Sequence, residues 1–210
     1  MDQPAPAGPV LDPSGNLYGT VGWGKYGFGE VFRLEPPGSS GAAWTCVSLH
    51  DFQGNDGAFP EPGLAFDKAG NLFGATLGSP EGSPDGNLYE LTPTWAGGWS
   101  ESVLYSFMPI ANGYNPNCGP IVGANGRVYG TAAEAGEFGF GVVFELTPPA
   151  AANGDWVYAM LYSFSGGSDG SPSHGLTFGR AGALHGSTTS GGNLSCGNGF
   201  GCETVYRVVP

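Results

Sequence analysis

Short apolar runs alternate with clusters of Gly, Pro, Asp and Asn along the whole chain, and the same runs return at a fixed interval. The intervals between successive copies of one glycine-flanked run are 55, 56 and 56 residues. The four copies of that run are 15–20 (GNLYGT), 70–75 (GNLFGA), 126–131 (GRVYGT) and 182–187 (GALHGS). A fixed period of this length is typical of repeat architectures. We therefore predict one domain over 1–210, made of four units at about 9–63, 64–119, 120–175 and 176–210.

Each unit contains up to four apolar runs, named a to d in chain order, which in the first unit are 9–12, 15–20, 30–34 and 44–52. The runs are rich in Val, Leu, Tyr and Phe and often alternate apolar with polar residues, as half-buried strands do. No segment shows a helical period. Four antiparallel strands per unit, repeated around a centre, predict an all-β protein of the β-propeller class.

The last unit contains runs a to c only, so we expect 15 strands and an incomplete fourth blade. An uncovered strand edge invites pairing with another chain. Three explanations are open: the blade is truncated, the N-terminal residues partly cover its edge, or the chain is part of a larger ring. The oligomeric state is accordingly either a monomer or a homodimer that completes such a ring.

Two kinds of recurring residue are predicted to be structural. Asp12 and Asp67 open glycine-containing turns between runs a and b, where an Asp side chain bonds the backbone of its own turn. A Trp opens run d in three units, as Trp44, Trp99 and Trp156, and we expect it to pack between units.

Composition narrows the function classes. The chain has 40 Gly and 18 Pro, but 40% hydrophobic and 13% aromatic residues are enough for a packed core. The formal net charge of −12, with only 6 Lys+Arg, disfavours nucleic acid and anionic membranes as partners. No apolar stretch approaches the ~18 residues that a membrane-spanning helix needs. Residues 1–4 (MDQP) do not resemble a leader, yet the acidic, Lys-poor composition fits a secreted or cell-surface protein.

The four cysteines divide into two sets. Cys196 and Cys202 flank a short glycine-rich loop that can bring their Cβ atoms within bridging range, which predicts a disulfide and an oxidising compartment. Cys46 and Cys118 lie in adjacent units, and they either pair or remain two separate buried thiols. No Cys or His pair has the spacing of a zinc site, so no zinc site is predicted.

A binding surface is predicted at one end of the strands. Strand alternation places the b–c and d–a loops at the same end, and the b–c loops are the most divergent segments of the repeat. The aromatic candidates for ligand contact on these loops are Trp23, Tyr26, Phe28, Tyr114, Phe138 and His174. Aromatic rings beside carboxylates suit a sugar, which has apolar faces and polar hydroxyls. The alternative is that these rings pack over the strand ends.

Catalysis is a second possibility. Paired loop carboxylates can hydrolyse a glycoside, and the candidates are Glu81, Asp85, Glu134 and Glu137. Acidic residues outnumber basic ones threefold, however, so coincidental pairs are expected and we favour a non-catalytic protein without a cofactor.

Two further features of the repeat have open interpretations. Asp56 and Asp169 precede a Gly at the same place in their units, where they either bind calcium or only form the turn. His50 and Asp51 replace the Tyr-Ser of two other units. His50 is either an aromatic substitute in a packing position or a functional break in the repeat.

The repeat resembles the bacterial GloVer tandem repeats. The shared segments are 161–164 (LYSF), 166–170 (GGSDG), 175–176 (GL), 15–20 (GNLYGT) and 143–148 (VFELTP). The a–b segment is also similar to an NHL-type blade. The resemblance implies a bacterial secreted or surface-anchored repeat protein and implies no activity. Three functions thus remain open: a non-catalytic propeller that binds a glycan or another small ligand, a carbohydrate-active hydrolase, and a structural assembly module.

Overall fold

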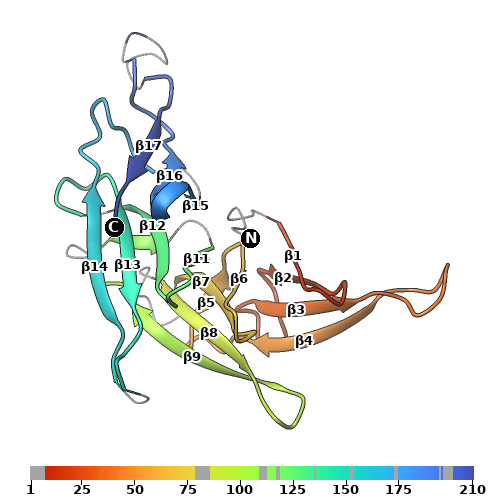
Figure 1. Cartoon of the computed structure of the whole chain (residues 1–210). Coiled ribbons are helices and arrows are strands. Elements are labelled where there is room, and N and C mark those ends of the chain that lie inside the picture. The colour runs from red at the N-terminus through yellow and green to blue at the C-terminus, as the bar shows by residue number, and fades with distance from the viewer. Residues whose placement is uncertain are drawn as a thin grey trace.

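The computed structural model describes residues 8–78, 86–108, 113–116, 119–134, 136–151, 154–172, 175–193, 195 and 201–210. The described residues form four antiparallel sheets that follow one another along the chain and in space (Figure 1). The only helical segment among the described residues is a short 3-10 turn, η1 (Arg180–Gly182). No helix in this part of the chain is long and apolar enough to cross a membrane. The all-β prediction is therefore confirmed.

Each sheet is built on the strands that the apolar runs of one repeat unit form. The first sheet contains β1 (Val10–Leu11), β2 (Leu17–Val21), β3 (Glu30–Glu35) and β4 (Thr45–Asp51). The second contains β5 (Ala58–Pro60), β6 (Ala65–Phe66), β7 (Leu72–Gly78), β8 (Asn87–Pro93) and β9 (Trp99–Ser106). The third contains β10 (Tyr114–Pro116), β11 (Ile121–Val122), β12 (Val128–Glu134), β13 (Val142–Thr147) and β14 (Val157–Ser163). The fourth contains β15 (Thr177–Phe178), β16 (Leu184–Ser187) and β17 (Val205–Val208).

Two of these strands, β5 and β10, were not expected from the sequence. They form in the segment that connects one sheet to the next. β5 pairs with the C-terminal half of β7, and β10 pairs with the C-terminal half of β12. Pro60 opposes Thr76 and Pro116 opposes Ala132, and an isolated bridge between Pro172 and Thr188 repeats the pairing in the fourth sheet. A Pro is tolerated in such a position because the strand lies at a sheet edge.

A glycine in the b strand of every sheet makes room for an aromatic ring. A Cβ on Gly74 would lie 2.2 Å from the hydroxyl of Tyr89, and one on Gly130 would lie 2.4 Å from the ring of Phe144. The pairs Gly19–Phe32 and Gly186–Tyr206 repeat this contact. The second glycine of the GNLYGT run is therefore required by packing.

The predicted turn chemistry is confirmed. Asp12 Oδ1 accepts hydrogen bonds from the backbone N–H groups of Ser14 and Asn16, at 2.8 and 2.9 Å. Its Oδ2 accepts from the Asn16 amide and the Tyr18 hydroxyl. Burial alone would raise the pKa of Asp12, but these hydrogen bonds outweigh it and lower the pKa below its usual value. Asp67 makes the same backbone bonds in the second unit.

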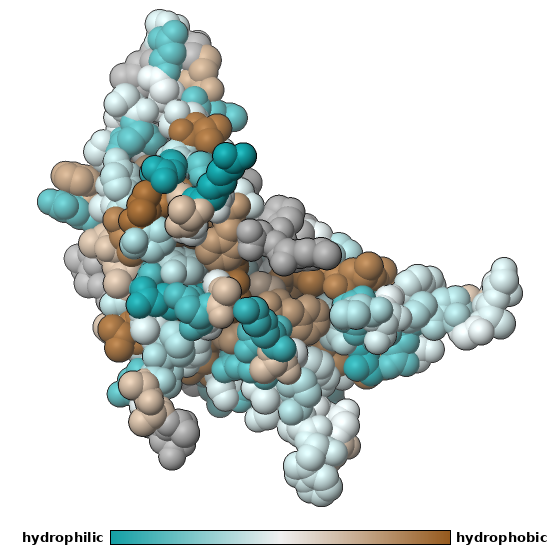
Figure 2. Space-filling model, in the orientation of Figure 1, coloured by the Kyte–Doolittle hydropathy of each residue, from teal (hydrophilic) through white to brown (hydrophobic). Residues whose placement is uncertain are grey.

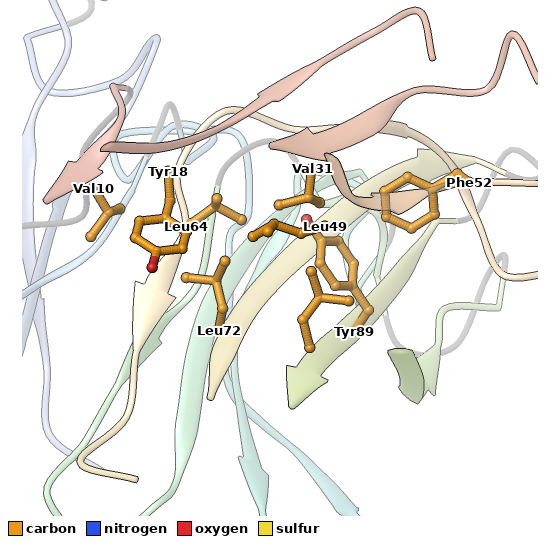
Figure 3. Packing of buried hydrophobic residues seen from close by; sticks show 9 residues of the cluster. Val10, Tyr18, Val31, Leu49, Phe52, Leu64, Leu72 and Tyr89 are labelled. Carbon is orange, nitrogen blue, oxygen red and sulfur yellow. The ribbon is translucent and has the colours of Figure 1, made fainter. Parts of the chain in front are cut away.

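The sheets pack face to face, and each junction uses equivalent residues. We call the face toward the next sheet the forward face and the opposite one the backward face. At the first junction, between the first and second sheets, forward residues meet backward residues in one buried cluster (Figure 3). Its members are Val10, Tyr18, Val31, Leu49 and Phe52 on one side and Leu64, Leu72, Tyr89 and Leu91 on the other. Two further clusters form the second and third junctions.

The recurring Trp side chains contribute to two of these junctions. Trp99 packs edge-on against Tyr18, with ring centroids 6.3 Å apart, and Trp156 packs in the same way against Phe73. Packing between units was the predicted role, and it is confirmed for these two residues. Trp44, which opens run d of the first unit, is 47% exposed.

The backward face of the first sheet is only partly covered by the described residues. Leu17, Phe32 and Leu34 are half-buried. Their equivalents in the second sheet, which the first sheet covers, are fully buried: Leu72, Tyr89 and Leu91. The first and fourth sheets stand apart at the two ends of an open arc (Figure 1). Apolar residues are exposed on the surface in the region of β1 and β2 (Figure 2).

Candidate functional site

Two sets of loops meet at one end of the sheets, which we call the loop end. In three sheets a Phe that follows the outermost strand donates its backbone N–H to a glycine carbonyl in the loop between runs b and c. These bonds are Phe52 to Gly29, Phe107 to Gly86 and Phe164 to Gly141, at 2.9–3.0 Å. The predicted meeting of b–c and d–a loops is thus present in the structure.

The loop between β2 and β3 presents two aromatic rings to solvent. Trp23 is 78% exposed and Tyr26 is 47% exposed. A hydrogen bond fixes the backbone of this loop, because the backbone N–H of Lys25 donates to Asp51 Oδ1 at 2.7 Å. Ser48 holds the other Asp51 oxygen at 3.1 Å. Lys25 Nζ lies 4.9 Å from the centroid of the Tyr26 ring, within the range of a cation–π contact.

The other predicted ligand-contact residues differ in their surroundings. Phe28 packs against the first core cluster, and its carbonyl accepts the backbone N–H of Phe59 at 2.7 Å. Tyr114 lies in β10 and packs against the second cluster. For these two residues the structure favours the packing alternative. Phe138 is exposed, and His174 lies outside the described residues.

Two of the four predicted catalytic carboxylates lie among the described residues. Glu81 and Asp85 lie outside the described residues. Glu134 is exposed at the end of β12 and accepts a hydrogen bond from the Asn115 amide at 3.3 Å. Glu137 is exposed in the next loop, and its backbone N–H donates to Ser163 Oγ at 2.8 Å. Their catalytic role stays a prediction.

A cluster of three potential ligand groups lies at the first junction. His50 comes from β4, Asp56 from the connection that follows it, and Glu101 from β9 of the next sheet. One donor atom of each lies within 4.8 Å of the others, and His50 Nε2 is 2.9 Å from Asp56 Oδ2. All three side chains are half-buried. We call these residues the junction cluster.

Glu101 is in an unfavourable environment for a carboxylate. Its Oε1 atom is buried and has no hydrogen-bond partner among the described residues. Burial, and secondarily the negative charge of Asp56, raises the pKa of Glu101 to about 7. The Tyr89 hydroxyl is also buried without a partner among the described residues, and burial raises its pKa strongly, with a further contribution from Glu101.

Neighbouring units place other groups at these positions. At the second junction the equivalents of His50 and Glu101 are Tyr105 and Tyr158, whose rings stack with centroids 4.7 Å apart and an interplanar angle of 15°. In the third unit the Tyr162 hydroxyl donates to Asp169 Oδ2 at 2.9 Å, in the place of the His50–Asp56 contact.

The sequence had marked His50 and Asp56 separately, and it gave no reason to select Glu101. One signal in the sequence could have pointed to Glu101: it is a carboxylate at a repeat position that is Cys46 in the first unit and Tyr158 in the third. Only the packing of β4 against β9 brings the three residues together.

The two predicted calcium ligands take part in turns. Asp56 Oδ1 accepts the backbone N–H groups of Gln53 and Gly54, at 2.8 and 3.1 Å. Asp169 accepts from both the backbone N–H and the hydroxyl of Ser165. Turn formation was the alternative interpretation, and these bonds support it. Calcium binding stays a prediction.

The cysteine predictions have mixed outcomes. Cys46 is free and exposed, so neither of the two open alternatives holds for it, the pairing with Cys118 or a buried thiol. It lies on the backward face of the first sheet, which the described residues cover only in part. Cys118 and Cys196 lie outside the described residues, and the Cys196–Cys202 disulfide stays a prediction.

Comparison with known proteins identifies both fold and family. A comparison with curated proteins gives no match. A crystal structure described as an oxidoreductase (glucose dehydrogenase) from Thermus thermophilus is similar, with a TM-score of 0.58 and 17% identity. The similarity covers 99% of this chain but 62% of that one, so the chain spans less than two thirds of the similar structure, and at this identity the similarity shows the fold alone. The Gloeobacter/Verrucomicrobia repeat matches residues 1–200, and the chain therefore belongs to this bacterial tandem-repeat family.

Proposed function

We propose that this chain is a secreted, non-catalytic β-propeller segment that binds a carbohydrate at its loop end. The observation that carries the proposal is the pair of solvent-facing rings, Trp23 and Tyr26, on a loop that Asp51 anchors. A ring held in place on a rigid scaffold loses little conformational entropy when a ligand stacks on it.

The ligand class follows from the chemistry of this end of the molecule. The apolar face of a sugar ring stacks on Trp or Tyr, while carboxylates accept hydrogen bonds from its hydroxyls. Exposed Glu134 and Glu137 supply such acceptors on the third sheet. Because the chain has a formal net charge of −12, a neutral or cationic glycan is favoured over an acidic one.

The propeller assignment rests on the regular junctions. Four sheets follow in chain order, and equivalent forward and backward residues pack at each of the three junctions. Such repetition around a centre is the arrangement of propeller blades. The fold shared with a longer Thermus thermophilus chain supports it.

A glycan array followed by calorimetric titration tests the binding proposal. We expect Trp23→Ala to weaken binding of a neutral glycan about 10-fold, since stacking on an aromatic ring is worth about 0.5–1.5 kcal/mol beyond the area that it buries. Trp95, in the hairpin between β8 and β9 at the opposite end, is 100% exposed and provides the matched control. Trp95→Ala should bind as the wild type does. Failure of the wild-type chain to bind any glycan would refute the proposal.

A second candidate function is assembly into a larger ring. The partly covered backward face of the first sheet, with Leu17, Phe32 and Leu34, supports it, because those positions are fully buried at the first junction. In the fourth sheet the forward residue Val205 is 77% exposed. A second copy that places its fourth sheet on the first would cover both faces. Light scattering should then give a dimer that Phe32→Asp converts to a monomer, whereas a wild-type monomer at high concentration would refute assembly.

A further inference from the structure

We propose that the junction cluster binds one divalent transition-metal ion, with Zn²⁺ the best match, through His50, Asp56 and Glu101. This inference is independent of carbohydrate binding at the loop end. It assigns the first junction a role that the other junctions of the chain do not share.

The donor set fits the ion. Zn²⁺ takes imidazole nitrogen and carboxylate oxygen at ~2.0–2.2 Å, often with three protein ligands and one open position. Donor atoms around one tetrahedral ion at that distance lie about 3.4 Å apart. The observed separations include 2.9 Å between His50 Nε2 and Asp56 Oδ2, and none of the three exceeds 4.8 Å, so small side-chain rotations suffice.

The charge balance of the cluster also favours a cation. Two carboxylates lie beside a His, and one carboxylate oxygen is buried without a hydrogen-bond partner among the described residues. All six Lys and Arg residues of the chain are described, and the side-chain ion pairs that they form join Arg33 to Glu35 and Arg127 to Glu145. None of these cations therefore neutralises the cluster. A bound metal ion supplies the missing positive charge and the missing partner of Glu101.

The fold itself does not require polar groups at this place. At the second junction the stacked rings of Tyr105 and Tyr158 occupy the positions of His50 and Glu101. Aromatic stacking stabilises a junction without any desolvation of charge. A His and a Glu in these positions are therefore better explained by a ligand than by packing.

Two other uses of the cluster fit less well. Calcium takes six to eight oxygen ligands, whereas this site offers a His nitrogen and one Asp56 oxygen that no turn N–H engages, because Oδ1 already accepts two of them. Glycoside hydrolysis by Asp56 and Glu101 would require both carboxyl groups to reach the sugar, and Glu101 Oε1 is buried.

Metal titration of the intact chain tests the proposal. After removal of metal with a chelator, calorimetry with Zn²⁺ should give one site per chain, and Co²⁺ should give the intense visible absorption of a four-coordinate centre. Glu101→Gln and His50→Tyr should each weaken Zn²⁺ binding at least about 100-fold, since loss of outer-shell partners alone costs ~10–100-fold. The first variant is isosteric, and the second introduces the residue that two other units already carry.

Asp169→Asn is the matched control, because Asp169 occupies the place of Asp56 but faces Tyr162. It should bind Zn²⁺ as the wild type does. Circular dichroism and thermal melting establish that each variant is folded. Three results would overturn the proposal: no Zn²⁺ binding by the folded wild type, undiminished binding by Glu101→Gln and His50→Tyr, or an equal loss in Asp169→Asn.

Discussion

The first and second junctions are built alike in their cores and differ at their outer strands. Both bury Leu or Val from runs b and c, together with the Phe that ends run d. At the outer edge, however, the second junction stacks Tyr105 on Tyr158, whereas the first places His50 and Asp56 beside Glu101. Core positions specify the fold in each unit, and the outer positions are free to acquire chemistry.

The largest expected effect concerns what the junctions share. Leu91→Ala at the first junction and Leu146→Ala at the second should each lower the free energy of unfolding by about 3 kcal/mol, because both side chains are fully buried. Replacing a buried Leu with Ala usually costs ~2–5 kcal/mol. Leu34→Ala, at the same repeat position in the first sheet, should cost less than about 1.5 kcal/mol, because Leu34 is half-buried. Urea denaturation measures all three. Equal losses would contradict the assignment of Leu34 to an open face.

The next effect separates the two outer edges. Tyr158→Ala should cost about 2–4 kcal/mol, because Tyr158 stacks on both Tyr105 and Phe144. Glu101→Ala, its counterpart, should change the stability of the metal-free chain by less than about 1 kcal/mol, since it removes a buried carboxylate oxygen that has no hydrogen-bond partner among the described residues. Denaturation in the presence of a chelator compares them. A larger loss for Glu101→Ala would reverse the comparison.

A smaller effect follows from converting one junction into the other. The double variant His50→Tyr, Glu101→Tyr should stack its new rings and stabilise the metal-free chain by about 0.5–1.5 kcal/mol, as aromatic pairs do. It should also lose any stabilisation that Zn²⁺ gives to the wild type. Thermal melting with and without Zn²⁺ measures both. A double variant that Zn²⁺ stabilises as much as the wild type would contradict the role of these two residues.

The smallest expected effect concerns Asp169 at the third junction. Burial alone would raise the pKa of Asp169, but hydrogen bonds from Ser165 and Tyr162 outweigh it and lower the pKa below its usual value. A lowered folded-state pKa stabilises the fold above the unfolded-state pKa of about 3.9, and this contribution is lost as the pH falls through the folded-state value. Because the hydrogen bonds of Asp169 are solvent-exposed, Asp169→Asn should cost under about 1 kcal/mol at pH 7. The variant should also lose less stability than the wild type between pH 4 and pH 2, which acid titration of unfolding would show.

Much of the fold was predictable because the apolar runs that form its strands recur at regular intervals along the chain. The intervals between glycine-flanked runs located all the strands except β5 and β10, and the Asp turns and two of the Trp contacts had the predicted roles. Strands β5 and β10 were missed because they are short, Pro-containing and stabilised only by pairing with β7 and β12.

The candidate sites were less predictable. Trp23 and Tyr26 are exposed as expected, but Phe28 and Tyr114 are packed, and sequence alone does not distinguish a ring that covers a core from one that faces solvent. The junction cluster was missed because Glu101 lies 45 residues after Asp56, on a different sheet. Contacts between sheets depend on tertiary packing, which no local pattern encodes.

Anomalous X-ray diffraction at the zinc absorption edge would locate a bound ion in a crystal of the intact chain. We expect one strong peak within ligand distance of His50, Asp56 and Glu101, and none beside Tyr105 and Tyr158. Crystals grown with Zn²⁺ that show no peak at the first junction, or peaks only elsewhere, would contradict it.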